Sequence, residues 1–177
     1  IIFLHKYISI LNMNNKDLKV AVLGAGAMGC LFGGLLAEKG LNVTLIDVWK
    51  EHVEEINKNG LKMDGHGGDR FIKIPATSDP SSIGKVDAVI VMCKATALEP
   101  ALKSIKNIIR DKTVFMSFQN GIGHEAIIKS IVGDEKVIGG TTTQASNILG
   151  PGHIMNHAAL PSSVSYTHLT LPTNGLV

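Results

Sequence analysis

Residues 18–47 decide the fold, and they run LKVAVLGAGAMGCLFGGLLAEKGLNVTLID. The pattern predicts a buried strand over residues 20–23, a helix over 27–39 and a second strand over 42–46. Asp47 follows that second strand directly. A strand, a glycine-rich turn, a helix, a strand and an acid in this order are typical of a dinucleotide-binding βαβ unit. A glycine turn with a purely structural role is the alternative.

Each glycine of the turn has a predicted task. Gly24 permits a tight turn, Gly26 lets the backbone approach a pyrophosphate, and Gly29 lets the helix pack closely on the strand. Free N–H groups at the start of the helix attract the phosphates. The candidate cofactor-binding residues of this unit are Gly24, Ala25, Gly26, Ala27, Met28, Gly29 and, at the ribose, Asp47.

Composition favours one globular α/β domain. The chain has 177 residues, of which 45% are hydrophobic and 18% charged. A net charge of +2 without a basic run gives no reason to expect a nucleic acid partner. The apolar opening is too short to span a bilayer and lacks signal-peptide features, so we expect no membrane partner. Cys30 and Cys93 form no C-x-x-C pair, which favours a reduced, cytoplasmic compartment.

The two ends of the chain look foreign to the domain. Met13 stands just before the first strand, so residues 1–12 are interpreted as a non-native upstream leader. Residues 164–169 translate one reading frame of a transposon-type sequencing adapter, so residues 161–177 are interpreted as a non-native tail. The dinucleotide-binding domain is therefore placed at residues 13–160.

The remaining pattern alternates helices with strands. Helices are predicted at residues 49–59, 96–109 and 124–132, with a capping box from Thr96 to Glu99. A hairpin is predicted within residues 61–75, and strands at 86–92, 113–118 and 136–140. Residues 141–147 and 153–158 are expected to add strands at the sheet edge. The predicted fold is Rossmann-like: a doubly wound, mostly parallel sheet with helices on both faces.

Polar residues follow two of these strands, where ligands of doubly wound sheets collect. Lys94 comes after the strand at 86–92 and can meet a phosphate or a carboxylate. Asn120 comes after the strand at 113–118, and its amide can both donate and accept hydrogen bonds. A solvated lysine and a turn-forming Asn-Gly pair are the alternatives.

Two weaker patterns favour structural roles. His153 and His157 are four residues apart, but their setting reads as a strand and no third ligand is evident, so no metal is predicted. Cys93 neighbours a cation that can lower a thiol pKa, although a buried thiol at a strand end is the simpler interpretation.

Several blocks together resemble the amino-terminal half of the ketopantoate reductase family. They are Gly24–Gly29, CKAT at 93–96, FQNGIG at 118–123, GGTTTQA at 139–145 and GPGH at 150–153. The resemblance implies an NAD(P)H-dependent oxidoreductase that reduces 2-dehydropantoate to (R)-pantoate in pantothenate biosynthesis. It implies supporting catalytic roles beside the nicotinamide and substrate for Lys94 and Asn120. It also implies a backbone contact to the cofactor near Ser146, where the family has alanine.

The same resemblance implies that the family's proton-donating lysine lies in a missing carboxyl-terminal helical domain. The chain is then a cofactor-binding half, inactive alone, and a homo-oligomer is left open for the full-length enzyme. Reduction of another 2-oxo acid and a non-catalytic NAD(P)-sensing module are the alternatives. The family implies NADPH, whereas Asp47 favours NADH, because its carboxylate repels a 2′-phosphate. Lys50 can partly offset that repulsion.

Overall fold

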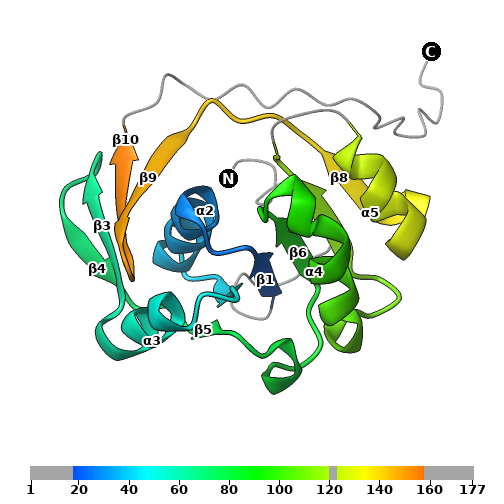
Figure 1. The fold of residues 1–177 in the computed structure, drawn as a ribbon, viewed down its shortest axis with the longest axis horizontal. Helices are drawn as coiled ribbons and strands as arrows, with labels where there is room; N and C mark the ends of the chain where they lie inside the picture. Colours follow the sequence, from blue (N-terminus) through cyan, green and yellow to red (C-terminus); the bar gives the residue numbers. More distant parts are fainter. Residues whose placement is uncertain (1–17, 120–122, 158–177) are drawn as a thin grey trace, which may run out of the picture.

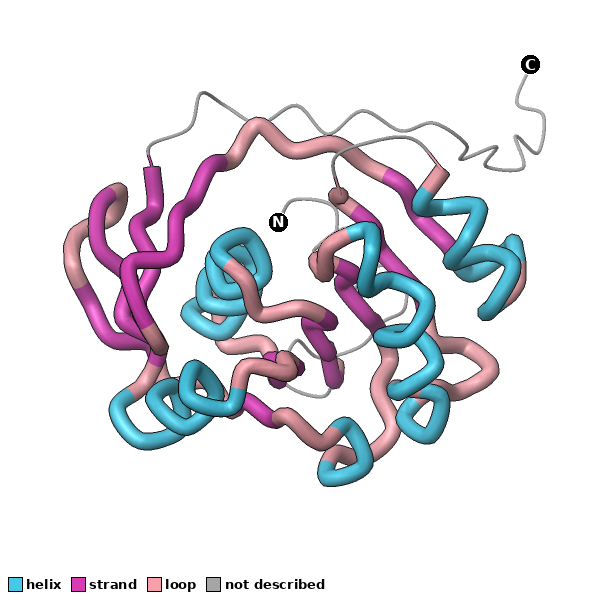
Figure 2. The backbone as a smooth tube through the Cα atoms, in the orientation of Figure 1, coloured by secondary structure: helices cyan, strands magenta, loops and turns pink. Residues whose placement is uncertain are grey.

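The computed structural model describes residues 18–119 and 123–157, which fold into two β-sheets and four α-helices (Figures 1 and 2). The strands are β1 (Lys19–Leu23), β2 (Asn42–Ile46), β3 (Leu61–Gly65), β4 (Arg70–Ile72), β5 (Ala76–Thr77), β6 (Ala88–Val91), β7 (Val114–Ser117), β8 (Val137–Gly139), β9 (Ala145–Gly150) and β10 (His153–His157). The α-helices are α2 (Ala27–Glu38), α3 (Lys50–Asn59), α4 (Leu98–Ser104) and α5 (His124–Val132). The predicted ends at 1–12 and 161–177 lie outside the described residues.

The main sheet has the strand order of a dinucleotide-binding fold. Its six strands lie in the order β5-β2-β1-β6-β7-β8, and every neighbouring pair is parallel. Numbered along the chain, this order is 3-2-1-4-5-6, which reverses direction between β1 and β6. The predicted Rossmann-like fold is confirmed, and the switch point lies beside the glycine-rich turn.

Helices cover both faces of this sheet, because successive strand residues point to opposite sides. On β1, Val20 and Val22 join the core cluster that contains α2 and α3. Ala21 and Leu23 join the cluster that contains α4 and α5. The alternation follows directly from the apolar run of the sequence, in which both faces of the strand are buried.

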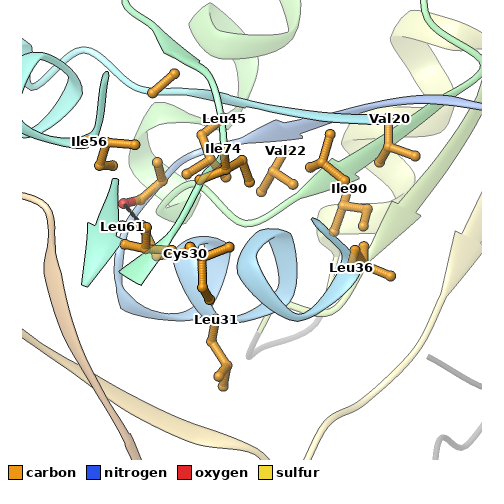
Figure 3. Packing of buried hydrophobic residues seen from close by; sticks show 14 of the residues in the cluster. Val20, Val22, Cys30, Leu31, Leu36, Leu45, Ile56, Leu61, Ile74 and Ile90 are labelled. Atoms are coloured by element: carbon orange, nitrogen blue, oxygen red, sulfur yellow. Dashed lines mark hydrogen bonds between the residues drawn. The ribbon is translucent and has the colours of Figure 1, made fainter. Parts of the chain in front are cut away.

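Helix α2 is buried on two sides. The second sheet, in the order β4-β3-β10-β9, lies across α2 from the main sheet (Figure 1). Leu31 points away from Val22 and Leu45 of the main sheet (Figure 3). A Cβ atom built on Gly33 would lie 2.5 Å from Leu45 Cδ2, and one on Gly34 would lie 2.9 Å from Met63 Cε. The adjacent glycines therefore let α2 approach both sheets.

The second sheet corrects one sequence prediction. The strands expected at 141–147 and 153–158 were placed at the edge of the main sheet, but β9 and β10 belong to the separate sheet. There β10 pairs in parallel with β3 of the confirmed β3–β4 hairpin and antiparallel with β9. The physical reason is that α2 is apolar on the side away from the main sheet and needs a cover.

The start of α4 corrects another prediction. No side chain caps this helix, which begins at Leu98 after a 3₁₀ turn over Ala95–Ala97, so the capping box at Thr96 is wrong. Glu99 instead accepts a hydrogen bond from Lys103 Nζ at 2.6 Å, one turn along the helix. The helical pattern also breaks after Ser104 and resumes as a 3₁₀ turn over Lys106–Ile108.

We predict that Gly34→Val destabilises the protein by about 1–3 kcal/mol, because the new side chain forces α2 away from the second sheet. The measurement is the free energy of unfolding in urea. Gly84→Val is the matched control, since nothing lies within 4 Å of a Cβ atom at Gly84. Equal stability of the two variants would contradict the close packing of α2.

Candidate functional site

The glycine-rich turn crosses the switch point of the main sheet. Gly24 has φ +96°, and a Cβ atom there would lie 2.5 Å from the backbone nitrogen of Cys93 at the end of β6. A Cβ atom on Gly29 would lie 1.9 Å from the carbonyl oxygen of Gly24. Both positions therefore accept glycine alone, in the roles the sequence predicts: a tight turn and close packing of helix on strand.

Gly26 is different, because the space around it is open. Nothing lies within 4 Å of a Cβ atom built on Gly26, and its backbone has an ordinary negative φ of −65°. Packing within the described part of the chain therefore does not require glycine here. No side chain among the described residues caps α2, whose N-terminus starts at this point. An open helix N-terminus without a side-chain cap fits an anionic group such as a pyrophosphate.

Asp47 holds the turn from the end of β2. Its Oδ2 accepts a hydrogen bond from the N–H of Ala25 at 2.7 Å, and its Oδ1 accepts one from the N–H of Trp49 at 3.0 Å. The carboxylate therefore lies beside the turn, as its sequence position predicts. No ion pair joins it to Lys50 in residues 18–119 and 123–157.

Lys94 lies beyond the end of β6, next to Cys93, which the glycine-rich turn approaches. The Lys94 side chain is exposed, and Lys94 directly precedes the 3₁₀ turn over Ala95–Ala97. Asn120 lies outside the described residues, whereas the preceding Gln119 lies within them. The Gln119 amide nitrogen donates to the carbonyl of Cys93, and its amide oxygen accepts from Ser117 Oγ at 3.1 Å. The Gln119 side chain thus ties the ends of β6 and β7 together.

Ser146 lies on β9 in the second sheet, not on the main sheet. Its hydroxyl donates to the carbonyl of Met155 at 2.9 Å, which joins β9 to β10. Strand β9 packs against α2, the helix that begins at the glycine turn. The predicted backbone contact with a cofactor near Ser146 stays a prediction, as do the catalytic roles of Lys94 and Asn120.

The weaker sequence candidates are engaged in structural contacts. His153 Nε2 lies 2.6 Å from Asp64 Oδ2, and this hydrogen bond holds the pKa of the Asp64 carboxyl below its ordinary value. No group of three metal-type side chains occurs within the ranges that the structure describes. Burial raises the pKa of the half-buried Cys93 thiol, which disfavours the thiolate and an activated cysteine.

Sequence reasoning missed a buried polar pair beneath the turn. Cys30 Sγ and His52 Nε2 lie 3.3 Å apart, and both residues are fully buried. The Cys30 thiol donates to the carbonyl of Ala25 at 3.0 Å, and the N–H of Gly152 donates to His52 Nδ1 at 2.9 Å. Burial raises the pKa of Cys30 and lowers that of His52. The available signal was that His52 lies on the same face of α3 as the apolar Val53 and Ile56.

Known proteins are similar to this chain over most of its length. No helix among the described residues is long and apolar enough to cross a bilayer. The family model described as ketopantoate reductase PanE/ApbA matches residues 20–168. The 2-dehydropantoate 2-reductases of Lactococcus lactis and Pyrococcus horikoshii are 36% and 42% identical, each over 76% of this chain. The family resemblance inferred from the sequence is confirmed.

A solved structure of D-mandelate dehydrogenase with NADH and anilino(oxo)acetate is also similar. It superposes with a TM-score of 0.81 at 35% identity, over 88% of this chain and 50% of that protein. The chain spans only 44% and 43% of the length of the Lactococcus and Pyrococcus relatives. The likeness therefore concerns the glycine-turn half of these enzymes.

We expect the protein to lose stability below about pH 6.5. The pKa of His52 lies below its ordinary 6.5 in the folded state, so the unfolded chain binds the proton first as the pH falls. The neutral, buried imidazole of His52 makes its full contribution to the free energy of unfolding above about pH 6.5. That contribution falls as the pH drops towards the folded-state pKa, by at most about 1.4 kcal/mol per pH unit. Urea unfolding from pH 7.5 to 5.5 measures it. His52→Gln lacks this titration, and identical pH profiles for both proteins would contradict the assignment.

Proposed function

Because the chain belongs to the ketopantoate reductase PanE/ApbA family, we propose that it binds a nicotinamide dinucleotide for the reduction of a 2-oxo acid. The observation that carries the proposal is the open space at Gly26 in front of the N-terminus of α2. Gly24 and Gly29 are explained by packing, but Gly26 is not. Its lack of a side chain makes sense if another molecule occupies that space.

Different residues around the turn would bind different parts of the cofactor. The N–H groups at the start of α2 would hold the pyrophosphate, and Asp47 would accept hydrogen bonds from the adenosine ribose. A bound reduced nicotinamide supplies the hydride for the ketone carbon. Lys94 and Asn120 would lie on that side, where an ammonium stabilises a carboxylate or a developing oxyanion and an amide orients a carbonyl. The backbone near Ser146 would complete the cofactor contacts.

The preferred substrate is 2-dehydropantoate, and the product is pantoate. The curated relatives with 36% and 42% identity are 2-dehydropantoate 2-reductases. Another 2-oxo acid is the second candidate, because the similar D-mandelate dehydrogenase binds anilino(oxo)acetate. The exposed Lys94 beside the turn favours an enzyme over a sensing module, which needs no charged group beside the nicotinamide.

NADH is the preferred cofactor. The Asp47 carboxylate is fixed by the N–H groups of Ala25 and Trp49, so a change in its orientation would break two hydrogen bonds. A fixed negative charge at this point repels the 2′-phosphate of NADPH. The similar D-mandelate dehydrogenase was solved with NADH. Lys50 forms no ion pair with Asp47 among the described residues that would neutralise this charge.

We predict that Gly26→Val abolishes NADH binding while the fold is retained. No atom of the described residues lies within 4 Å of a Cβ atom at Gly26, so we expect the valine side chain to occupy the space proposed for the pyrophosphate. Titration calorimetry gives the affinity and thermal unfolding gives the stability. Gly84→Val is the control away from the turn. Unchanged affinity in Gly26→Val would refute the assignment of the turn as the cofactor site.

The proposed preference for NADH over NADPH is tested by comparing the affinities of the two cofactors. We expect NADH to bind more tightly than NADPH, and Asp47→Asn to reduce that preference about tenfold by removing one negative charge. The asparagine oxygen can still accept the Ala25 N–H, whereas the Trp49 N–H loses its acceptor. Asp111→Asn, at an exposed position before β7, is the matched charge control. Tighter NADPH binding by the unaltered protein would show that Asp47 does not face the ribose.

A further inference from the structure

The buried Cys30–His52 pair connects three parts of the fold. Cys30 lies on α2, His52 lies on α3, and both contact backbone groups of other segments. We propose that Cys30 and His52 are positioning residues that orient the Ala25–Gly26 peptide of the glycine turn for cofactor binding. The inference rests on the proposed function of the turn as the cofactor site.

The hydrogen bonds of the pair run in one direction. The Gly152 N–H can only donate, so His52 Nδ1 must be an unprotonated acceptor at their 2.9 Å contact. A neutral imidazole then carries its proton on Nε2, which faces Cys30 Sγ at 3.3 Å. The Cys30 S–H in turn donates to the Ala25 carbonyl. The chain therefore leads from Gly152 through both side chains to the turn.

The end of this chain determines where a backbone donor points. The Ala25 carbonyl and the Gly26 N–H belong to one trans peptide, in which these groups point in opposite directions. A carbonyl held by the buried Cys30 thiol therefore turns the Gly26 N–H away from the core. Among the described residues, nothing lies within 4 Å of a Cβ atom built on Gly26, which leaves room beside this peptide for a phosphate. Cys30 thus orients a donor without touching the cofactor.

A second contact holds the same turn from the other side. The Ala25 N–H donates to Asp47 Oδ2, while the Ala25 carbonyl accepts from Cys30. The two peptides that flank the Ala25 Cα are thus both fixed. His52 is held in turn by the ring of Trp49, which stacks on it with centroids 4.9 Å apart. The Gly152 turn of the second sheet anchors the far end.

The test compares Cys30→Ala with Cys30→Ser in the full 177-residue chain. Serine keeps a donor for the Ala25 carbonyl, whereas alanine removes it. We expect Cys30→Ala to weaken NADH binding about threefold to tenfold, the loss of one net hydrogen bond, and to shift the Gly26 amide resonance of the ligand-free protein. Cys30→Ser should restore both towards the unaltered protein. Leu31→Val is the control for a cavity in α2 without loss of a polar contact.

The outcomes separate this inference from the proposed function. No NADH binding by the unaltered chain would refute the proposed function, and the Gly26 amide resonance would still decide the orientation of the peptide. Unaltered affinity and resonance in Cys30→Ala would overturn the inference, as would an equal loss of affinity in Leu31→Val. If Cys30→Ala does not fold, His52→Asn replaces it, since asparagine can accept from Gly152 but is too short to reach Cys30.

The tautomer of His52 can be measured separately. The nitrogen chemical shifts of the His52 ring should show the Nε2–H tautomer, and the other tautomer would overturn the direction of the hydrogen bonds.

Discussion

The close approach of α2 to the layers on either side governs the rest of the structure. Three glycines make it possible: Gly29 at the turn, Gly33 against the main sheet and Gly34 against the second sheet. With so little room for side chains, the helix has one position between the sheets. Its N-terminus is therefore fixed beyond the carboxyl end of β1, where the strand order reverses. The anion-binding end of the helix meets the switch point of the sheet because of this packing.

The same confinement explains why polar groups are buried beneath the turn. An unpartnered thiol or imidazole in this core would cost free energy, but Cys30 and His52 are partnered by each other and by two backbone groups. Asp47 likewise makes contacts within the protein, since its carboxylate accepts hydrogen bonds from two backbone N–H groups. A ribose would have to share an acceptor that already stabilises the turn. In the proposed function, cofactor recognition and local stability would therefore be coupled at one carboxylate.

Proteins named for different substrates share this half of the fold. A D-mandelate dehydrogenase and 2-dehydropantoate 2-reductases are similar to the chain over much the same length. In the proposed function, the residues of the glycine turn would therefore recognise the cofactor rather than the 2-oxo acid. Lys94 is an exposed cation beyond the end of β6, and in the proposed function it would meet a substrate carboxylate.

The sequence by itself determined the βαβ unit, because its signals are local. Apolar runs, helical spacing and glycines predicted β1, α2, β2 and the place of Asp47. The predicted helix at 124–132 likewise matches α5. Only the tertiary structure decided the contacts between distant segments. The two-residue strand β5 exists because the edge of β2 is free to pair with it, and β9 and β10 form a second sheet because α2 needs a cover. Cys30 and His52 are 22 positions apart, and no periodic pattern links them. Their contact follows from how α2 and α3 pack, which residue spacing along the chain does not encode.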